Sequence, residues 1–246
     1  NDNKLWIGHG SNEGIDLLNL KDYSQGKTSL THLKNDPLDY NSIGDNSIFT
    51  LYQDKFNDIW VGTFGGGVNY YSKRSKKFHV VKELYGSQES IKNNLVNSFF
   101  EEDNYLWIGT EGGLDRLNKK TGKYDHYQYE SNNPRSLASN PVYAITKDSK
   151  GNLWVGTWAG GLHLYNYNTN DFTRFLPGGE GTIGSGNIFD IVEDSFGNLW
   201  IGTGAGGLNK YDYKTGKFKK YIKDEKDPHS LNGRSMSHVM QTSDGK

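Results

Sequence analysis

Short runs of alternating apolar and polar residues, separated by turns rich in glycine, asparagine and aspartate, recur along the whole chain. The pattern is clearest between residues 187 and 221. It predicts four strands there, at about 188–192, 199–203, 208–213 and 217–221. Glycine and asparagine favour the tight turns that must join such short strands. The chain is therefore expected to form many short strands, and a helical bundle is excluded.

One motif, Leu-Trp-Ile-Gly with close variants, recurs five times at a spacing of 54, 47, 47 and 46 residues. Its tryptophans account for five of the six in the chain: Trp6, Trp60, Trp107, Trp154 and Trp200. A period near 46 with four strands per repeat is typical of β-propeller blades. We predict an all-β propeller of four-stranded blades, with these tryptophans as structural core packed between neighbouring blades.

The repeat units are expected at about 1–45, 46–93, 94–139, 140–186 and 187–234, with a partial first strand of a further blade at 235–246. The chain thus begins at a second strand, and Val239 to Gln241 could pair with Leu5 to Ile7 to close a ring of five. Both ends, however, carry the turn that joins these two strands, and a ring closed there needs only one copy. We therefore interpret residues 1–246 as one segment of a larger propeller array.

Each repeat also has a linker in which Ser or Thr precedes an apolar residue. We expect this apolar residue to fill the space between blades. The five positions are Ile43, Ile91, Leu137, Ile183 and Leu231.

Composition and charge exclude several functional classes. Lys and Arg number 28 against 29 Asp and Glu, which leaves no electrostatic footprint for nucleic acid. No apolar run approaches the length of a membrane span. The chain has no cysteine, which excludes disulfides, thiolate zinc sites and cysteine nucleophiles. The seven histidines lack metal-site spacing, so we predict no metal, no cofactor and no catalytic residue.

The residue after each Gly-Thr pair varies while the surrounding frame stays constant. Variable side chains on a repeated frame are how a scaffold acquires a specific site. The predicted ligand-binding residues are Phe64, Glu111 and Trp158, together with His9, which is shifted by one position. An aromatic face among polar groups suits a neutral or acidic sugar. Two alternatives stay open: Trp158 lies over the neighbouring blade, or the face docks another propeller or protomer.

The motif order also resembles a known family. Trp200-Ile201-Gly202-Thr203, then Gly206-Gly207-Leu208, then Thr215-Gly216-Lys217-Phe218, then Asp227-Pro228-His229-Ser230-Leu231 is similar to the two-component regulator propeller repeat. The first copy departs from it, because His9 replaces Thr and the turn at 10–14 is longer.

The resemblance implies the periplasmic sensor region of a Bacteroidetes hybrid two-component histidine kinase. Such a region responds to a glycan or oligosaccharide, is not catalytic itself, and has its kinase elsewhere in the protein. The implied partners are an oligosaccharide and either a neighbouring propeller or the second protomer of a dimeric sensor.

Two alternatives remain beside the sensor. A propeller lyase similar to streptogramin lyase would need a His and a Glu that meet at one mouth of the channel. His9 and Glu111 are residues of these types and lie in equivalent turns of different repeats. Their spacing in the sequence does not show whether they meet. The other alternative is a purely structural protein–protein interaction propeller.

Overall fold

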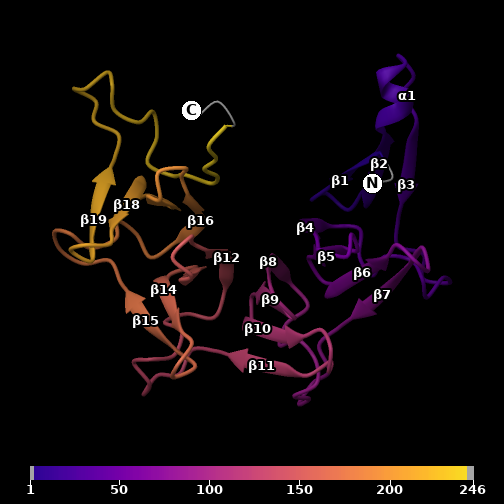
Figure 1. Cartoon of the computed structure of the whole chain (residues 1–246), viewed down its shortest axis with the longest axis horizontal. Coiled ribbons are helices and arrows are strands. Elements are labelled where there is room, and N and C mark those ends of the chain that lie inside the picture. The colour runs from indigo at the N-terminus through magenta and orange to yellow at the C-terminus, as the bar shows by residue number, and fades with distance from the viewer. Residues whose placement is uncertain (1–2, 243–246) are drawn as a thin grey trace. The chain divides into compact units, whose positions relative to one another are not determined.

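The computed structural model describes residues 3–242, and these residues form small antiparallel sheets in consecutive order, here termed blades 1 to 5 (Figure 1). The chain divides into two compact units. One unit comprises Asn1–Glu111 with Asp115–His126, and the other comprises Gly112–Leu114 with Tyr127–Lys246. The predicted all-β class and consecutive blade order are confirmed.

The first three blades contain the following elements. Blade 1 contains β1 Lys4–Gly8, β2 Ile15–Asn19, the short helix α1 Leu20–Ser24 and β3 Leu30–Leu33. Blade 2 contains β4 Ile48–Gln53, β5 Ile59–Thr63, β6 Val68–Ser72 and β7 Lys77–Val81. Blade 3 contains β8 Val96–Glu102, β9 Tyr105–Thr110, β10 Gly113–Asn118 and β11 Tyr124–Tyr127. Blade 1 thus has three strands in the described chain, because β1 corresponds to the second strand of the other blades.

The last two blades follow the same plan. Blade 4 contains β12 Val142–Lys147, β13 Leu153–Thr157, β14 Gly161–Asn166 and β15 Asp171–Phe175. Blade 5 contains β16 Ile188–Glu193, β17 Leu199–Thr203, β18 Leu208–Asp212 and β19 Lys217–Tyr221.

Blades 1 and 2, 2 and 3, and 4 and 5 pack face to face. In each of these pairs, a row of apolar side chains on the later blade covers the repeat tryptophan of the earlier blade. In blade 5, strand register aligns Leu199, Tyr211 and Phe218 across one face of the sheet. This row belongs to the same apolar cluster as Trp154 of blade 4, whose ring centre lies 5.1 Å from that of Tyr211. Trp154 is consequently buried. The corresponding clusters place Trp60 against Leu106 and Leu117, and Trp6 against Ile59 and Phe78.

In blades 2 to 5, the indole Nε1 of the repeat tryptophan donates a hydrogen bond to an acidic residue in the preceding turn or, in blade 3, at the end of the first strand. The pairs are Trp60–Asp54 at 3.1 Å, Trp107–Glu102 at 3.2 Å, Trp154–Asp148 at 2.8 Å and Trp200–Asp194 at 2.8 Å. In Asp54, Asp148 and Asp194, the other carboxylate oxygen, Oδ1, accepts a backbone N–H group within the same turn. Each of these three aspartates therefore fixes its turn and its tryptophan together.

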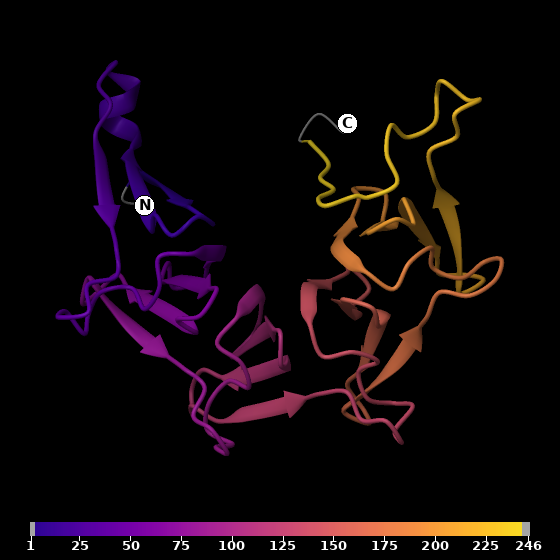
Figure 2. The ribbon, with the colours of Figure 1, turned by 180° about the vertical axis from the view of Figure 1, so that it is seen from behind.

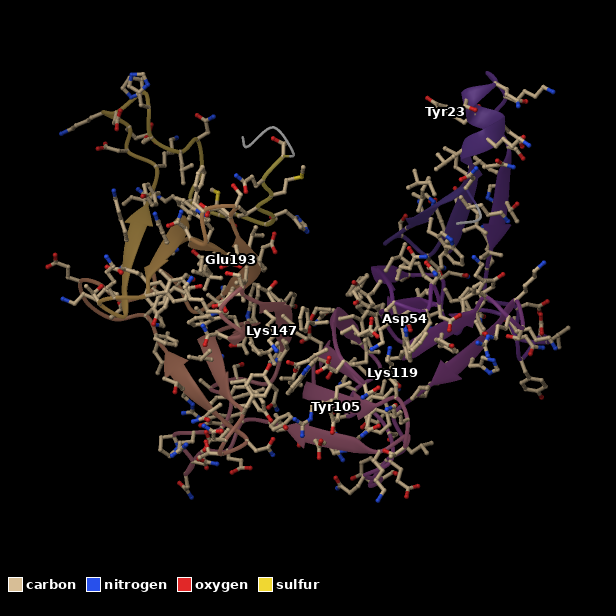
Figure 3. All side chains as sticks on the ribbon, viewed as in Figure 1. Tyr23, Asp54, Tyr105, Lys119, Lys147 and Glu193 are labelled. Atoms are coloured by element: carbon tan, nitrogen blue, oxygen red, sulfur yellow. The ribbon has the colours of Figure 1, made fainter. Side chains whose placement is uncertain are left out.

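Two of these carboxylates also bind the following blade. Asp148 accepts a hydrogen bond from the Tyr213 hydroxyl of blade 5 at 2.9 Å. At the equivalent place, the Lys119 ammonium of blade 3 lies 3.4 Å from Asp54 (Figure 3). Burial alone would raise the pKa of Asp148, but hydrogen bonds from Trp154, Asn152 and Tyr213 outweigh it and hold the pKa below its ordinary value.

The linkers are anchored through one buried position on the third strand. The apolar linker residues Ile43, Ile91, Leu137 and Ile183 are fully buried. The backbone N–H that follows each of them donates to a buried side chain, which satisfies a group that would otherwise lack a partner. The four bonds are Gly44 to Asn69 at 2.6 Å, Lys92 to Asp115 at 3.0 Å, Ala138 to His163 at 2.9 Å and Gly184 to Asn209 at 2.8 Å.

His163 must be neutral to fill this position. Its Nε2 accepts the Ala138 N–H, and its Nδ1 lies 3.3 Å from the Val155 carbonyl, to which it donates. Burial lowers the pKa of His163 to about 4. A protonated ring would carry a second N–H in place of the lone pair that holds the linker.

Residues 235–242, expected to begin a further blade, form no strand but lie along blade 5 (Figure 2). The Met236 N–H donates to the Thr203 carbonyl at 2.9 Å, as the Ile48 N–H of blade 2 donates to His9. The Ser195 N–H donates to Gln241, as the Ser149 N–H of blade 4 donates to Glu193 of blade 5. The segment therefore contacts blade 5 as a first strand contacts the preceding blade. The remainder of the predicted strand, 243–246, lies outside the described residues.

The His163 pocket makes stability depend on pH. The ordinary histidine pKa of about 6.5 applies in the unfolded chain, whereas the folded value is about 4. The unfolded state therefore takes up the proton first, and stability falls as pH drops from about 6.5 to about 4, by on the order of 3 kcal/mol. Urea denaturation across this range measures the loss. His163→Asn introduces the residue found at the equivalent positions 69 and 209, and should remove this component; an unchanged pH profile would contradict the assignment.

The Asp148 carboxylate should contribute more to the unfolding free energy than Asp194, its counterpart in blade 5. Asp148→Ala leaves the Trp154 indole and the Tyr213 hydroxyl without their acceptor, and we expect a loss of about 2–4 kcal/mol in unfolding free energy. Asp194→Ala is the matched control, because Asp194 bonds its turn and Trp200. Its smaller loss, together with a Tyr213→Phe variant that is less harmful in the Asp148→Ala background, would isolate the bond between blades. Equal losses would argue against it.

Candidate functional site

The first strand of each four-stranded blade carries a β-bulge at its second residue. The strand register shifts between Ile48 and Thr50, Val96 and Ser98, Val142 and Ala144, and Ile188 and Asp190. The bulged residues are Phe49, Asn97, Tyr143 and Phe189. Bulges redirect side chains and are common beside functional sites. They define a second variable position in each blade.

The variable residue after Gly-Thr is held directly beside this bulge. Its backbone N–H donates to the carbonyl that precedes the first strand. The four bonds run from Phe64 to Ser47, Glu111 to Leu95, Trp158 to Pro141 and Gly204 to Asn187, at 2.9–3.1 Å. The constant threonine fixes the turn, since the buried hydroxyls of Thr63, Thr157 and Thr203 donate to the carbonyls of Gly67, Gly161 and Gly207. The Gly-Thr pair thus has a structural role, whereas the side chain of the residue that follows it can vary.

In blades 2 to 5 the bulged residue and the turn residue therefore lie side by side, and their chemistry differs between blades. Phe49 and Phe64 of blade 2 meet edge to face at 5.6 Å. In blade 3, the Asn97 amide donates to Glu111 at 3.0 Å. In blade 5 the turn residue is Gly204, and a Cβ there would lie only 2.9 Å from the Phe189 ring. That glycine leaves room for the phenylalanine.

The aromatic residues of blades 4 and 5 form one cluster. The Trp158 ring centre lies 5.9 Å from that of Tyr143 and 5.6 Å from that of Phe189, and Tyr143 and Phe189 are 6.1 Å apart. Trp158 therefore lies over the neighbouring blade, yet 43% of its surface remains exposed. The Asn187 amide oxygen accepts the Ala159 N–H at 2.9 Å and places a polar side chain beside the cluster.

His9 occupies a different position from the other predicted site residues. Its N–H donates to Gly14, as the Thr203 N–H donates to Gly207, so His9 stands at the place of the frame threonine. Its Nε2 lies 3.1 Å from Asp16, which also binds Nδ1 of His32 at 2.6 Å. Hydrogen bonds from His32 and then His9 lower the pKa of Asp16. Phe64, Glu111 and His9 thus each belong to a separate local contact within their unit.

The bulged residues were not among the residues predicted from the sequence. In three first strands they could be recognised because the alternation of apolar and polar residues is interrupted by two adjacent large apolar residues. These pairs are Ile48-Phe49, Val142-Tyr143 and Ile188-Phe189. In a regular strand, two adjacent side chains point to opposite faces of the sheet, whereas a bulge redirects one of them.

Within residues 3–242, no group of three or more His, Asp or Glu side chains is arranged so that it could hold a metal ion. The helix in this part of the chain is far too short to cross a membrane.

The family model of the two component regulator propeller matches residues 42–65, 136–159 and 182–205. These matches run from the linker through the first strand to the variable turn of blades 2, 4 and 5. The predicted resemblance to this repeat is confirmed. No curated protein matches the sequence.

Solved structures share the fold. The extracellular domain of a putative hybrid two component system from Bacteroides thetaiotaomicron is 26% identical, with a TM-score of 0.78 over 98% of this chain and 30% of its own. A putative one component system of that organism is 20% identical, with a TM-score of 0.65 over 99% and 36%. The virginiamycin B lyase of Staphylococcus aureus is 15% identical, with a TM-score of 0.62 over 92% and 68%. The chain spans about a third of the length of these two Bacteroides structures, both of which are extracellular domains.

Two tryptophans of blade 4 should respond differently to truncation. Trp154→Ala opens a cavity in a buried cluster, and we expect unfolding free energy to fall by about 3–5 kcal/mol. Trp158→Ala removes a half-exposed ring from the surface, so its cost should be about 1 kcal/mol. Thermal and urea melts of the two variants give the comparison. Equal destabilisation would mean that Trp158 serves only as core.

Proposed function

We propose that this chain, which carries two-component regulator propeller repeats, is the ligand-sensing part of an extracytoplasmic, periplasmic sensor of the hybrid two-component type. One observation carries the proposal: an aromatic cluster of Tyr143, Trp158 and Phe189, in which Trp158 is exposed, lies on a backbone arrangement that recurs between blades. Its similarity to extracellular domains of two component systems supports the sensor assignment.

The chemistry of the cluster favours a carbohydrate. Aromatic faces stack on the C–H faces of sugar rings, and hydroxyl groups need donors and acceptors nearby. The Asn187 amide, whose oxygen accepts the Ala159 N–H, is one such polar group beside Trp158. The ligand class that we propose is therefore a glycan or oligosaccharide, recognised without catalysis. A neighbouring propeller or the second protomer of the sensor would transmit the response.

A lyase with the same fold would need catalytic residues as well as a binding surface. It needs a histidine and a glutamate that converge on one substrate. In this chain His9 is bound to Asp16 and Glu111 to Asn97, each within its own blade. These contacts favour binding over catalysis.

Calorimetric titration with a panel of neutral and acidic oligosaccharides tests the proposal. Trp158→Ala should weaken binding by about 5- to 150-fold, which corresponds to the roughly 1–3 kcal/mol of one aromatic stacking contact. Phe196→Ala is the matched control, because Phe196 is also exposed but lies in the turn at the other end of β17.

Chromatography of the same mixtures follows the fate of the sugar. Unchanged oligosaccharide is expected. A tight ligand that is unaffected by Trp158→Ala would place the site elsewhere, and a cleaved product would replace the sensor by an enzyme.

A further inference from the structure

A cavity of about 530 Å³ lies between blades 2 and 3, and all the residues that line it belong to one compact unit. At the equivalent place between blades 4 and 5, Tyr211 packs on Trp154 and the Tyr213 hydroxyl binds the carboxylate of the turn. Blade 3 has Leu117 in place of Tyr211 and Lys119 in place of Tyr213. The cavity lies beside both of these residues, where the two tyrosine rings are missing.

The walls of the cavity are largely aromatic. Phe56, Trp60 and Tyr70 come from blade 2 and Tyr124 comes from blade 3, and the ring centres of Trp60 and Tyr70 lie 4.7 Å apart. Aromatic faces attract cations. The chain itself uses this property, because the Lys119 ammonium lies 5.3 Å from the Phe56 ring centre. The cavity therefore already holds one ammonium group beside an aromatic ring.

The charges that line the cavity are mostly negative. Three carboxylates face one ammonium: Asp54, Asp58 and Glu89 against Lys119. Two of the carboxylates are already bound, since Asp54 accepts from Lys119 and Asp58 accepts from the Tyr70 hydroxyl. An excess of negative charge in a recess with apolar walls raises the local concentration of cations and disfavours anions.

Two polar groups on the cavity wall have capacity for a ligand. In the part of the chain that the structure describes, neither the Glu89 carboxylate nor the Tyr124 hydroxyl has a hydrogen-bond or ion-pair partner. They lie near each other, because the Tyr124 ring stacks on His126, whose Nε2 lies 3.1 Å from the carbonyl of Gln88, the residue before Glu89. Burial raises the pKa of Tyr124 to about 12, so its hydroxyl stays neutral.

We propose that this cavity binds a small organic cation, a primary ammonium group carried on a six-membered ring. The ammonium donates hydrogen bonds to the Glu89 carboxylate and the Tyr124 hydroxyl oxygen, and the ring packs against the aromatic walls. Repulsion from Lys119 keeps the charge of the ligand on the Glu89 side. An amino sugar and an apolar cyclic amine share this chemistry. The site is separate from the Trp158 cluster of blades 4 and 5.

Calorimetric titration with two matched pairs of compounds tests the proposal. The pairs are glucosamine with glucose and cyclohexylamine with cyclohexanol, and each pair differs in its positive charge. We expect at least one amine to bind, and its neutral counterpart to bind at least about tenfold more weakly because it lacks the charged donor. The amine that binds identifies the source, sugar or apolar. Failure of both amines to bind, or neutral compounds that bind as tightly, overturns the proposal.

Variants of the cavity wall locate the site. Glu89→Gln should weaken amine binding about tenfold, because a charged acceptor is lost. Leu117→Tyr introduces the residue of blade 5 and should abolish binding by filling the space. Glu83→Gln is the matched control, since Glu83 lies in the same linker but does not line the cavity. Near-ultraviolet circular dichroism confirms that each variant remains folded.

Trp158→Ala distinguishes this site from the proposed glycan site. Amine binding should be unchanged in this variant, whether or not the aromatic cluster of blades 4 and 5 binds a glycan. Amine binding that is lost in Trp158→Ala would place the amine at that cluster and overturn the proposal. Amine binding that is unchanged in both Glu89→Gln and Leu117→Tyr would overturn it as well.

Discussion

The structure depends on one constraint: each blade is a small sheet with two apolar faces, and it can bury them only against other blades. The row Leu199, Tyr211 and Phe218 buries Trp154 because both rows are in strand register across their sheets. Trp200 and Leu5, which are not covered by such a row among the described residues, are half-buried and exposed, respectively. Burial here is a property of pairs of blades.

Polar groups complete these contacts in a repeated way. A carboxylate holds the tryptophan nitrogen and its own turn, and in two blades it also binds the next blade through Lys119 or Tyr213. A third-strand amide, carboxylate or imidazole holds the linker N–H. Because these bonds satisfy the tryptophan nitrogens and the linker N–H groups, the side chains at the tips of the turns between second and third strands are not needed for this purpose.

That freedom is what a binding surface needs. The bulge and the Gly-Thr frame place two variable residues together in each four-stranded blade, and blades 4 and 5 use them to build the Trp158 cluster. The same frame carries an Asn–Glu pair in blade 3 and a phenylalanine pair in blade 2. The scaffold thus changes the chemistry of its surface without changing its backbone, which suits a sensor that must discriminate among related ligands.

The sequence by itself determined the blades, because the tryptophan period, the alternation and the turn residues are local signals that each short strand carries within itself. It also pointed to the turn residues Phe64, Glu111 and Trp158, since variation within a constant frame is visible along the chain. Only the tertiary structure decided which residues join them. The bulges that bring Tyr143 and Phe189 to Trp158 depend on strand register, and so does the place of His9 at the frame threonine. The neutral state of His163 and the exposure of Trp200 likewise depend on what the rest of the chain packs against them, which no local pattern encodes.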